Sequence, residues 1–219
     1  NKEIESVSMF KDFNLTVNKG DKIAFAGPNS LAKSTLFQIL AGELEPDSGS
    51  FRWGVTITHS YFPKENGAYF ADDGFDLVGW MRQFASAKED ESFVRGFLGR
   101  MLFSGEEAMK KTSVLSGGER VRCMLSRMML AGANVLMLDE PTNHLDLESI
   151  TSLNNALTAY SEVALFASHD HQFVSTVANR IIEFFPDRIV DEMMDFDDYL
   201  AIRDGDLAND GDFAEQKAA

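Results

Sequence analysis

The segment from residue 22 to residue 42 constrains the fold more than any other part of this 219-residue chain. Residues 22–27 form a short apolar run that ends in glycine, as expected of a buried strand that feeds a loop. Residues 34–41 have helical character and stop at Gly42. A strand, a loop and a helix in this order place backbone N–H groups and the positive end of a helix dipole at the loop. The sequence therefore predicts an anion-binding loop in an α/β domain.

Apolar runs and helical segments alternate through much of the remaining chain. Strands are expected at 135–138, 163–167 and 180–184, and helices at 119–131, 149–160 and 171–179. Strands that alternate with helices predict a mostly parallel sheet with helices packed on it. Further strands are expected at 13–17, 51–53 and 55–62, and one helix over 191–203.

Residues 67–111 have a different pattern, with large apolar residues such as Trp80 and Phe97 at helical spacing. We interpret them as a small helical subdomain inserted into an α/β core formed by residues 1–66 and 112–203. Residues 204–219 are acidic and rich in Gly, Asp, Asn and Ala, and they are predicted to form a disordered tail.

The loop itself has the composition of a phosphate-binding loop. Lys33 would reach the β- and γ-phosphates of a nucleotide, the Ser34 hydroxyl would bind Mg²⁺, and Thr35 would support the α-phosphate. The nucleotide-binding residues expected in this loop are Gly27, Asn29, Ser30, Ala32, Lys33, Ser34 and Thr35.

Ser30 and Ala32 stand where such loops usually carry glycine. If both residues hold a negative φ, the loop still forms. If either needs a positive φ, the strain is roughly 1–2 kcal/mol, which would weaken nucleotide binding without abolishing it.

Two acidic residues, Asp139 and Glu140, end the apolar strand at 135–138. A carboxylate in this place can hold Mg²⁺ directly or through water. Because adjacent residues of an extended strand point to opposite sides, separate roles for these carboxylates require a turn of the backbone. We attribute that turn to Pro141.

The run Leu115-Ser116-Gly117-Gly118-Glu119 resembles the signature sequence of ATP-binding-cassette (ABC) ATPases. The run Val135–Asp146 resembles their Walker B strand with its catalytic glutamate and following loop, and its last four residues, Asn143-His144-Leu145-Asp146, are similar to the F branch (ABC-F), which acts on ribosomes. The resemblance covers about residues 8–200. It implies an ABC-type P-loop NTPase fold with a mostly parallel core sheet and an antiparallel β portion, and Mg²⁺-dependent hydrolysis of ATP.

The resemblance also implies roles for single residues. Glu140 matches the general base, and His169 matches the switch histidine that contacts the γ-phosphate and helps to hold the attacking water. Ser34 and Asp139 are the implied metal residues. Lys64 stands where a glutamine is expected, and a protonated lysine cannot ligate Mg²⁺, so it could contact phosphate or serve a partner surface.

Members of this family bind ATP between two cassettes, so this chain is expected to need a second one. The loop Ser116-Gly117-Gly118 would present N–H groups and a hydroxyl to the γ-phosphate bound by that partner. Asp146 would communicate between the two sites, and we interpret His144 as structural. The end of the chain, 194–200, favours the second cassette of a tandem, with the ribosome as its expected partner.

The net charge of −15 argues against a general affinity for nucleic acid. Ribosome binding would therefore need basic contacts on other parts of a parent protein, or a local patch, and the sequence shows no strong basic cluster. No apolar run approaches the roughly 18 residues of a membrane helix. A start at Asn1 with neither Met nor a leader suggests a piece of a longer protein, and the single Cys123 in an apolar run fits a buried thiol and a cytoplasmic setting.

Two other functions remain open: the ATPase subunit of an ABC transporter, and an ATP-binding regulatory module with weak turnover. The adenine site is a gap in either case. Residues 1–8 contain no aromatic side chain on which the base could stack, and Phe10 is expected in the core.

Overall fold

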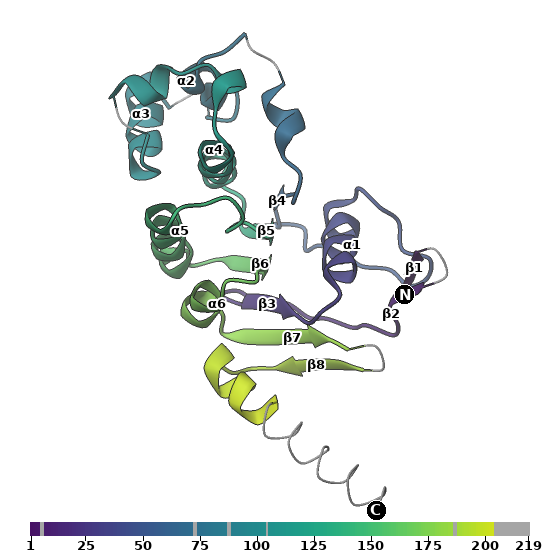
Figure 1. Cartoon of the computed structure of the whole chain (residues 1–219). Helices are drawn as coiled ribbons and strands as arrows, with labels where there is room; N and C mark the ends of the chain where they lie inside the picture. Colours follow the sequence, from purple (N-terminus) through teal and green to yellow (C-terminus); the bar gives the residue numbers. More distant parts are fainter. Residues whose placement is uncertain (5–6, 72–73, 87–88, 104, 186–187, 204–219) are drawn as a thin grey trace, which may run out of the picture.

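The computed structural model describes residues 1–4, 7–71, 74–86, 89–103, 105–185 and 188–203. Its main sheet contains the strands β3 (Lys22–Ala26), β4 (His59–Phe62), β5 (Val135–Asp139), β6 (Val163–Ala167), β7 (Arg180–Phe184) and β8 (Ile189–Glu192). They lie in the order β4-β5-β6-β3-β7-β8 (Figure 1). A separate antiparallel pair joins β1 (Lys2–Ile4) to β2 (Val7–Phe10).

Five strands of the main sheet are parallel, and β8 alone among its strands pairs antiparallel, with β7. The first of them along the chain, β3, lies between β6 and β7. After β3 the chain forms β4, β5 and β6 on one side and then crosses β3 to form β7 on the other. The carboxyl ends of all five parallel strands meet at one edge. Open α/β sheets bind ligands at such a switch point, and the predicted phosphate loop begins there, directly after Ala26.

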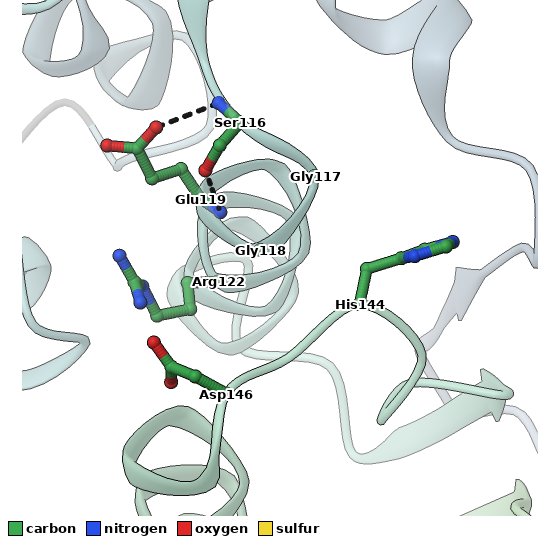
Figure 2. Close-up of a pocket in the computed structure, with 7 residues that line it drawn as sticks. All are labelled: Ser116, Gly117, Gly118, Glu119, Arg122, His144 and Asp146. Carbon is green, nitrogen blue, oxygen red and sulfur yellow. Dashed lines mark hydrogen bonds between the residues drawn. The ribbon is translucent and has the colours of Figure 1, made fainter.

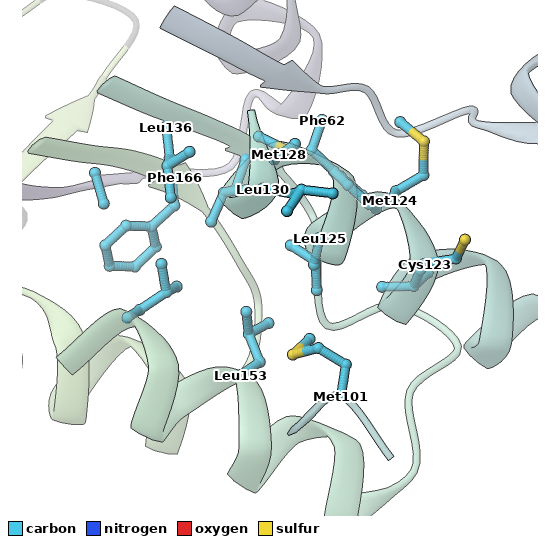
Figure 3. Packing of buried hydrophobic residues seen from close by; sticks show 14 of the residues in the cluster. Phe62, Met101, Cys123, Met124, Leu125, Met128, Leu130, Leu136, Leu153 and Phe166 are labelled. Atoms are coloured by element: carbon cyan, nitrogen blue, oxygen red, sulfur yellow. The ribbon is translucent and has the colours of Figure 1, made fainter. Parts of the chain in front are cut away.

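Helices cover both faces of the main sheet. On one face lies α1 (Ser30–Ala41), and on the other lie α4 (Gly117–Leu130), α5 (Leu147–Ala159) and α6 (His171–Val177) (Figure 1). Alternate residues of each strand divide between these faces. Leu136 and Phe166 pack with Leu125 and Leu153 under α4 and α5 (Figure 3), whereas Met137 packs in the cluster beneath α1. Burial on both faces explains why β6 and residues 135–138 of β5 are continuous apolar runs.

The segment between β4 and α4 is helical, as its spacing predicts. It contains α2 (Leu77–Arg82), α3 (Glu91–Arg100) and the 3-10 turns Gly67–Phe70, Gly105–Met109 and Thr112–Val114. Asp76 and Asp90 cap the two helices by accepting hydrogen bonds from backbone N–H groups at 2.7 and 2.8 Å. In Figure 1, α2 and α3 lie on the side of α4 that is away from the sheet, and their apolar side chains belong to the cluster that continues under α4. The division of the chain into a core and an inserted subdomain stays a prediction.

Two expected strands are wrong, and a third is shorter than expected. Residues 13–17 do alternate, with Phe13, Leu15 and Val17 turned toward the core, but they pair with no strand in the described part of the chain. Alternating burial thus occurs here without a hydrogen-bonded ladder. Residues 51–53 are not strand, and the strand expected at 55–62 is shortened to β4 because Ile57 N–H donates to Gly54 C=O in a turn and Val55 is fully exposed.

The expectation of one helix over 191–203 is also wrong in its first part. Residues 189–192 form β8, which pairs with β7, and the helix comprises residues 196–203. The periodicity of a short apolar segment does not distinguish these alternatives, since pairing with a neighbouring strand decides it. Cys123 is fully buried, as expected.

The predicted tail at 204–219 lies outside the described residues. In the portion of the chain that is described, no helix is long and apolar enough to cross a membrane.

Candidate functional site

The phosphate loop connects the end of β3 to the start of α1. Gly27 has a φ of 101°, and a Cβ at this position would lie 2.6 Å from the carbonyl oxygen of Phe184. Both facts require glycine here. Asn29 caps α1, because its side-chain oxygen accepts a hydrogen bond from Ala32 N–H at 3.0 Å. The loop is thus fixed at both ends before any ligand arrives.

Neither Ser30 nor Ala32 has a positive φ. Both lie in the first turn of α1, and Ala32 is fully buried in the apolar cluster beneath that helix. The alternative left open by the sequence is therefore resolved: the loop forms without left-handed strain at either position.

Lys33 is 2% exposed, and its Nζ donates a hydrogen bond to the Gly27 carbonyl oxygen at 3.0 Å. Burial lowers the pKa of Lys33, and three nearby carboxylates oppose that effect. They belong, in order of their effect, to Glu140, Asp139 and Glu183. A buried ammonium so placed, at the start of a helix, suits an anionic ligand.

Asp139 ends β5 and is 2% exposed. Burial raises the pKa of its carboxyl group, while a hydrogen bond with the Ser34 side chain acts in the opposite direction. The two predicted metal residues, Ser34 and Asp139, are therefore in contact.

Glu140 has a φ of 53°, which is rare for a residue with a side chain. Its N–H donates to Ala167 C=O at 2.9 Å, and its side chain is almost fully buried. The turn that separates Glu140 from Asp139 thus occurs at Glu140 itself, one residue before the Pro141 to which we attributed it. Strain of this kind costs on the order of 1–3 kcal/mol and is common at functional sites.

His169 lies across from Glu140, with 3.2 Å between its Nε2 and Glu140 Oε1. The same nitrogen is 3.5 Å from Ser30 Oγ. The His169 side chain is 67% exposed. Two loops and a helix N-terminus therefore bring His169, Glu140 and Ser30 to one place at the carboxyl edge of the sheet.

Several buried polar atoms at this edge have no hydrogen-bond partner among the described residues. They are Thr35 Oγ1, Asp139 Oδ2 and both carboxylate oxygens of Glu140. An unpaired buried polar group is costly, and the carboxylates of Asp139 and Glu140 act on the charge of Lys33. A phosphate chain with a divalent cation would supply the missing partners, so the residues present fit Mg²⁺ and a nucleotide.

The described residues contain no cluster of three His, Cys, Asp or Glu side chains that could hold a metal by themselves. This agrees with Mg²⁺, which is usually bound by one or two protein ligands together with substrate phosphates.

Thr142 and Ser168 were not expected as site residues. Their hydroxyl oxygens lie 2.8 Å apart, and Ser168 Oγ also accepts from Asp170 N–H at 3.1 Å. These bonds brace the loop after Glu140 against the loop that carries His169. The sequence indicates these two residues only by their positions, Thr142 shortly after Glu140 and Ser168 directly before His169. The contact between their hydroxyl groups depends on the pairing of β5 with β6.

The signature loop forms a second polar centre at the start of α4 (Figure 2). Ser116 and Glu119 form a capping box, in which Ser116 Oγ accepts from Glu119 N–H at 3.3 Å and Glu119 Oε2 accepts from Ser116 N–H at 2.8 Å. Lys110 Nζ lies 2.7 Å from Glu119 Oε1. Burial would raise the pKa of Glu119, but the bonds from Lys110 and Ser116 prevail and lower it to about 2.

An open pocket of about 580 Å³ lies at this loop. Its lining residues are Ser116, Gly117, Gly118, Glu119, Arg122, His144 and Asp146 (Figure 2). A Cβ on Gly118 would lie 3.0 Å from the His144 carbonyl oxygen, so the loop after Glu140 packs closely on the signature loop. No residue of the phosphate loop lines the pocket. Of the predicted residues, the structure thus brings Gly27–Thr35, Asp139, Glu140 and His169 together and leaves Ser116–Gly118 apart.

Two further positions bear on the site. Lys64 is exposed, and its charge acts on both Lys33 and Asp139, but its role stays a prediction. Phe10 is buried with its ring 6.1 Å from that of Phe13 and 6.2 Å from that of Phe184, as expected of a core residue.

Known proteins are similar to this chain over the part that contains these motifs. Residues 10–143 match the family model described as ABC transporter. The chain is 59% identical over 199 residues to the uncharacterized ABC transporter ATP-binding protein YkpA of Bacillus subtilis, covering 91% of this chain and 37% of YkpA. It is 34% identical over 197 residues to ABC transporter F family member 5 of Arabidopsis thaliana, covering 90% and 28%. It is 33% identical over 183 residues to the energy-dependent translational throttle protein EttA of Haemophilus influenzae, covering 81% and 32%.

Among solved structures, the dimeric post-hydrolysis state of the ATP-binding cassette MJ0796, bound to ADP and Pi, has a TM-score of 0.70 to this chain, with 16% identity over 89% of this chain and 94% of the other. At that identity the likeness shows the fold. The chain spans about a third of the length of the curated relatives it matches.

Proposed function

This chain belongs to the ABC transporter family, in its F branch, and on that premise we propose that it is one ATP-hydrolysing cassette of a larger translation-associated ATPase. The observation that carries the proposal is the set of unpartnered buried oxygens of Thr35, Asp139 and Glu140 around Lys33. Hydrolysis would convert ATP and water to ADP and phosphate.

The chain's own residues suit this reaction. Lys33 and the backbone N–H groups at the start of α1 bind the phosphates, and the Thr35 hydroxyl supplies a further donor. When bound by Ser34 and Asp139, Mg²⁺ would neutralise charge that develops on the phosphates.

Glu140 accepts a proton from the attacking water as general base. Glu140 Oε1 and His169 Nε2 lie 3.2 Å apart, so both side chains can contact the same water molecule on the side that faces the substrate. His169 is exposed, so it can donate to the γ-phosphate while Glu140 stays buried.

A second cassette completes the site in this proposal. The pocket at Ser116–Gly118 contains no residue of the chain's own phosphate loop, and it opens to solvent with N–H groups at the start of a fourteen-residue helix. It therefore suits a γ-phosphate held by another cassette. The dimer formed by MJ0796 supports this arrangement.

The ribosome is the proposed partner of the whole protein, and the cytoplasm is the proposed place of action. The similarity to EttA, a translational throttle protein, supports both. Because the net charge of this chain is −15, the contacts with ribosomal RNA would come from other parts of the protein.

Ribosome co-sedimentation tests this proposal. The full-length protein that carries Glu140→Gln should be retained on ribosomes with ATP and released with ADP, because the amide binds nucleotide but cannot act as the base. The matched control adds Lys33→Ala, which should abolish retention. Absence of ATP-dependent retention in a sample with demonstrated ATP binding would contradict the translation role and favour a transporter subunit.

A further inference from the structure

Glu183 is a buried carboxylate beside the phosphate loop that the proposed reaction does not use. It is 4% exposed and lies in β7, where it pairs with Ala26, the last residue of β3. The carbonyl oxygen of the next residue, Phe184, lies so close to Gly27 that it leaves no room for a Cβ there. Glu183 therefore lies where the chain enters the phosphate loop.

The charge of Glu183 acts on Lys33, in the same sense as the charges of Glu140 and Asp139. A carboxylate that turned toward Lys33 would compete with phosphate for the ammonium group, and the competition would be strong because the surroundings are buried. The site therefore works best if the Glu183 side chain is held elsewhere.

The helix at 196–203 holds it. The Tyr199 hydroxyl donates a hydrogen bond to Glu183 Oε2, and Arg203 Nη1 lies 3.8 Å from Glu183 Oε1. Tyr199 is 4% exposed, so its bond to Glu183 is shielded from water. Both oxygens of Glu183 are thus engaged from the side of this helix.

The helix itself is fixed in place by local contacts. Asp195 caps it, since its side chain accepts from Asp198 N–H at 2.9 Å. Asp197 Oδ1 accepts from Ser175 Oγ at 3.0 Å and lies 3.4 Å from His171 Nε2, which joins the helix to α6. Tyr199 therefore approaches Glu183 from a docked element.

We propose that Tyr199 is a positioning residue of the nucleotide site: its hydroxyl holds the Glu183 carboxylate toward the C-terminal helix and leaves Lys33 available to the phosphates of ATP. This inference rests on the proposed role of Lys33 in phosphate binding.

The test measures ATP affinity by calorimetry in the full-length protein, with EDTA and with Mg²⁺. Tyr199→Phe, which removes only the hydroxyl, should weaken ATP binding at least threefold in both buffers. In a Glu183→Gln background the same change should have no effect, because a neutral amide does not compete for Lys33. Tyr160→Phe is the matched control, since it also removes a phenol bond, to the Ala133 carbonyl, and should leave affinity unchanged.

An equal loss of affinity from Tyr199→Phe in both backgrounds would show a merely structural role and overturn the inference, as would no loss in either. Thermal unfolding confirms that each variant is folded. Lys33→Ala serves as the reference and should weaken binding at least tenfold. If Lys33→Ala has no effect, the proposed phosphate site fails; if it alone weakens binding, only the role of Tyr199 fails.

Discussion

The phosphate-loop centre and the signature-loop centre satisfy their polar groups in opposite ways. At the first, buried oxygens of Thr35, Asp139 and Glu140 make no hydrogen bond to the described residues, although Glu140 Oε1 lies 3.2 Å from His169 Nε2. At the second, Ser116 and Glu119 satisfy each other, and Lys110 completes the pairing.

The difference shows two kinds of preorganisation. In the first centre, polar atoms are buried without hydrogen bonds, and a bound ligand can offset the free-energy cost of that burial. Its residues should therefore govern ligand affinity and turnover. The second centre is complete without a ligand and offers a rigid helix start to the proposed second cassette, so Glu119 and Lys110, which have no proposed part in binding phosphate, should govern the stability of the fold. Four substitutions test that contrast.

The largest effect is expected from Glu140→Gln in the first centre. Turnover should fall about 10²–10⁴-fold, the usual contribution of a general base. The free energy of unfolding should change little by comparison, because the relief of a buried carboxylate without a hydrogen bond in the described residues is offset by the loss of its favourable charge effect on Lys33. Steady-state hydrolysis and urea unfolding measure the two effects. Glu148→Gln, on the exposed surface of α5, is the control, and wild-type turnover in Glu140→Gln would remove this residue from the mechanism.

An intermediate effect, on stability alone, is expected at Glu119 in the second centre. Its pKa is lowered from 4.5 to about 2 in the folded chain, so its carboxylate stabilises the fold above its ordinary pKa. That contribution should be lost as the pH falls from 4.5 toward 2. Urea unfolding of Glu119→Gln at several pH values should therefore differ from wild type at pH 7 and converge with it at low pH.

Lys110→Gln sharpens the same measurement, because it removes the ammonium that lies 2.7 Å from Glu119 Oε1. It should reduce the pH dependence in that window. A constant difference between Glu119→Gln and wild type at all pH values would contradict the proposed contribution of charge.

The smallest effect is expected from Ala32→Gly, which restores the usual glycine of the loop. Because Ala32 has a helical backbone and a buried methyl group, glycine should cost about 1 kcal/mol of stability. ATP affinity should remain within twofold of wild type, since the loop already forms without strain. Tighter binding by calorimetry would instead show that the Ala32 methyl group crowds the phosphates.

Buried elements were the most predictable part of the fold. The strands expected at 163–167 and 180–184 are confirmed with the same bounds. All five residues of each are buried; the first is a continuous apolar run, and the second has the apolar residues Ile181, Ile182 and Phe184. At residues 13–17 the alternating sequence pattern predicted a strand wrongly. Leu15 and its neighbours do alternate in burial, but no strand pairs with them in the described part of the chain.

The candidate site divides in the same way. Gly27, Lys33 and Asp139 could be located from short motifs, because a phosphate loop and a strand-end carboxylate have local signatures. The positive φ of Glu140, the Thr142–Ser168 brace and the Tyr199–Glu183 bond could not, since each depends on which strands and loops become neighbours.

The sequence by itself determined the family, the order of the motifs and the strand-loop-helix unit that binds phosphate, because these depend on residues close together in the chain. Only the tertiary structure decided that no residue of the phosphate loop lines the signature-loop pocket, and that a tyrosine of the C-terminal helix holds a carboxylate beside Gly27. These features arise from contacts between segments far apart in sequence, and the energy of such contacts leaves no local pattern.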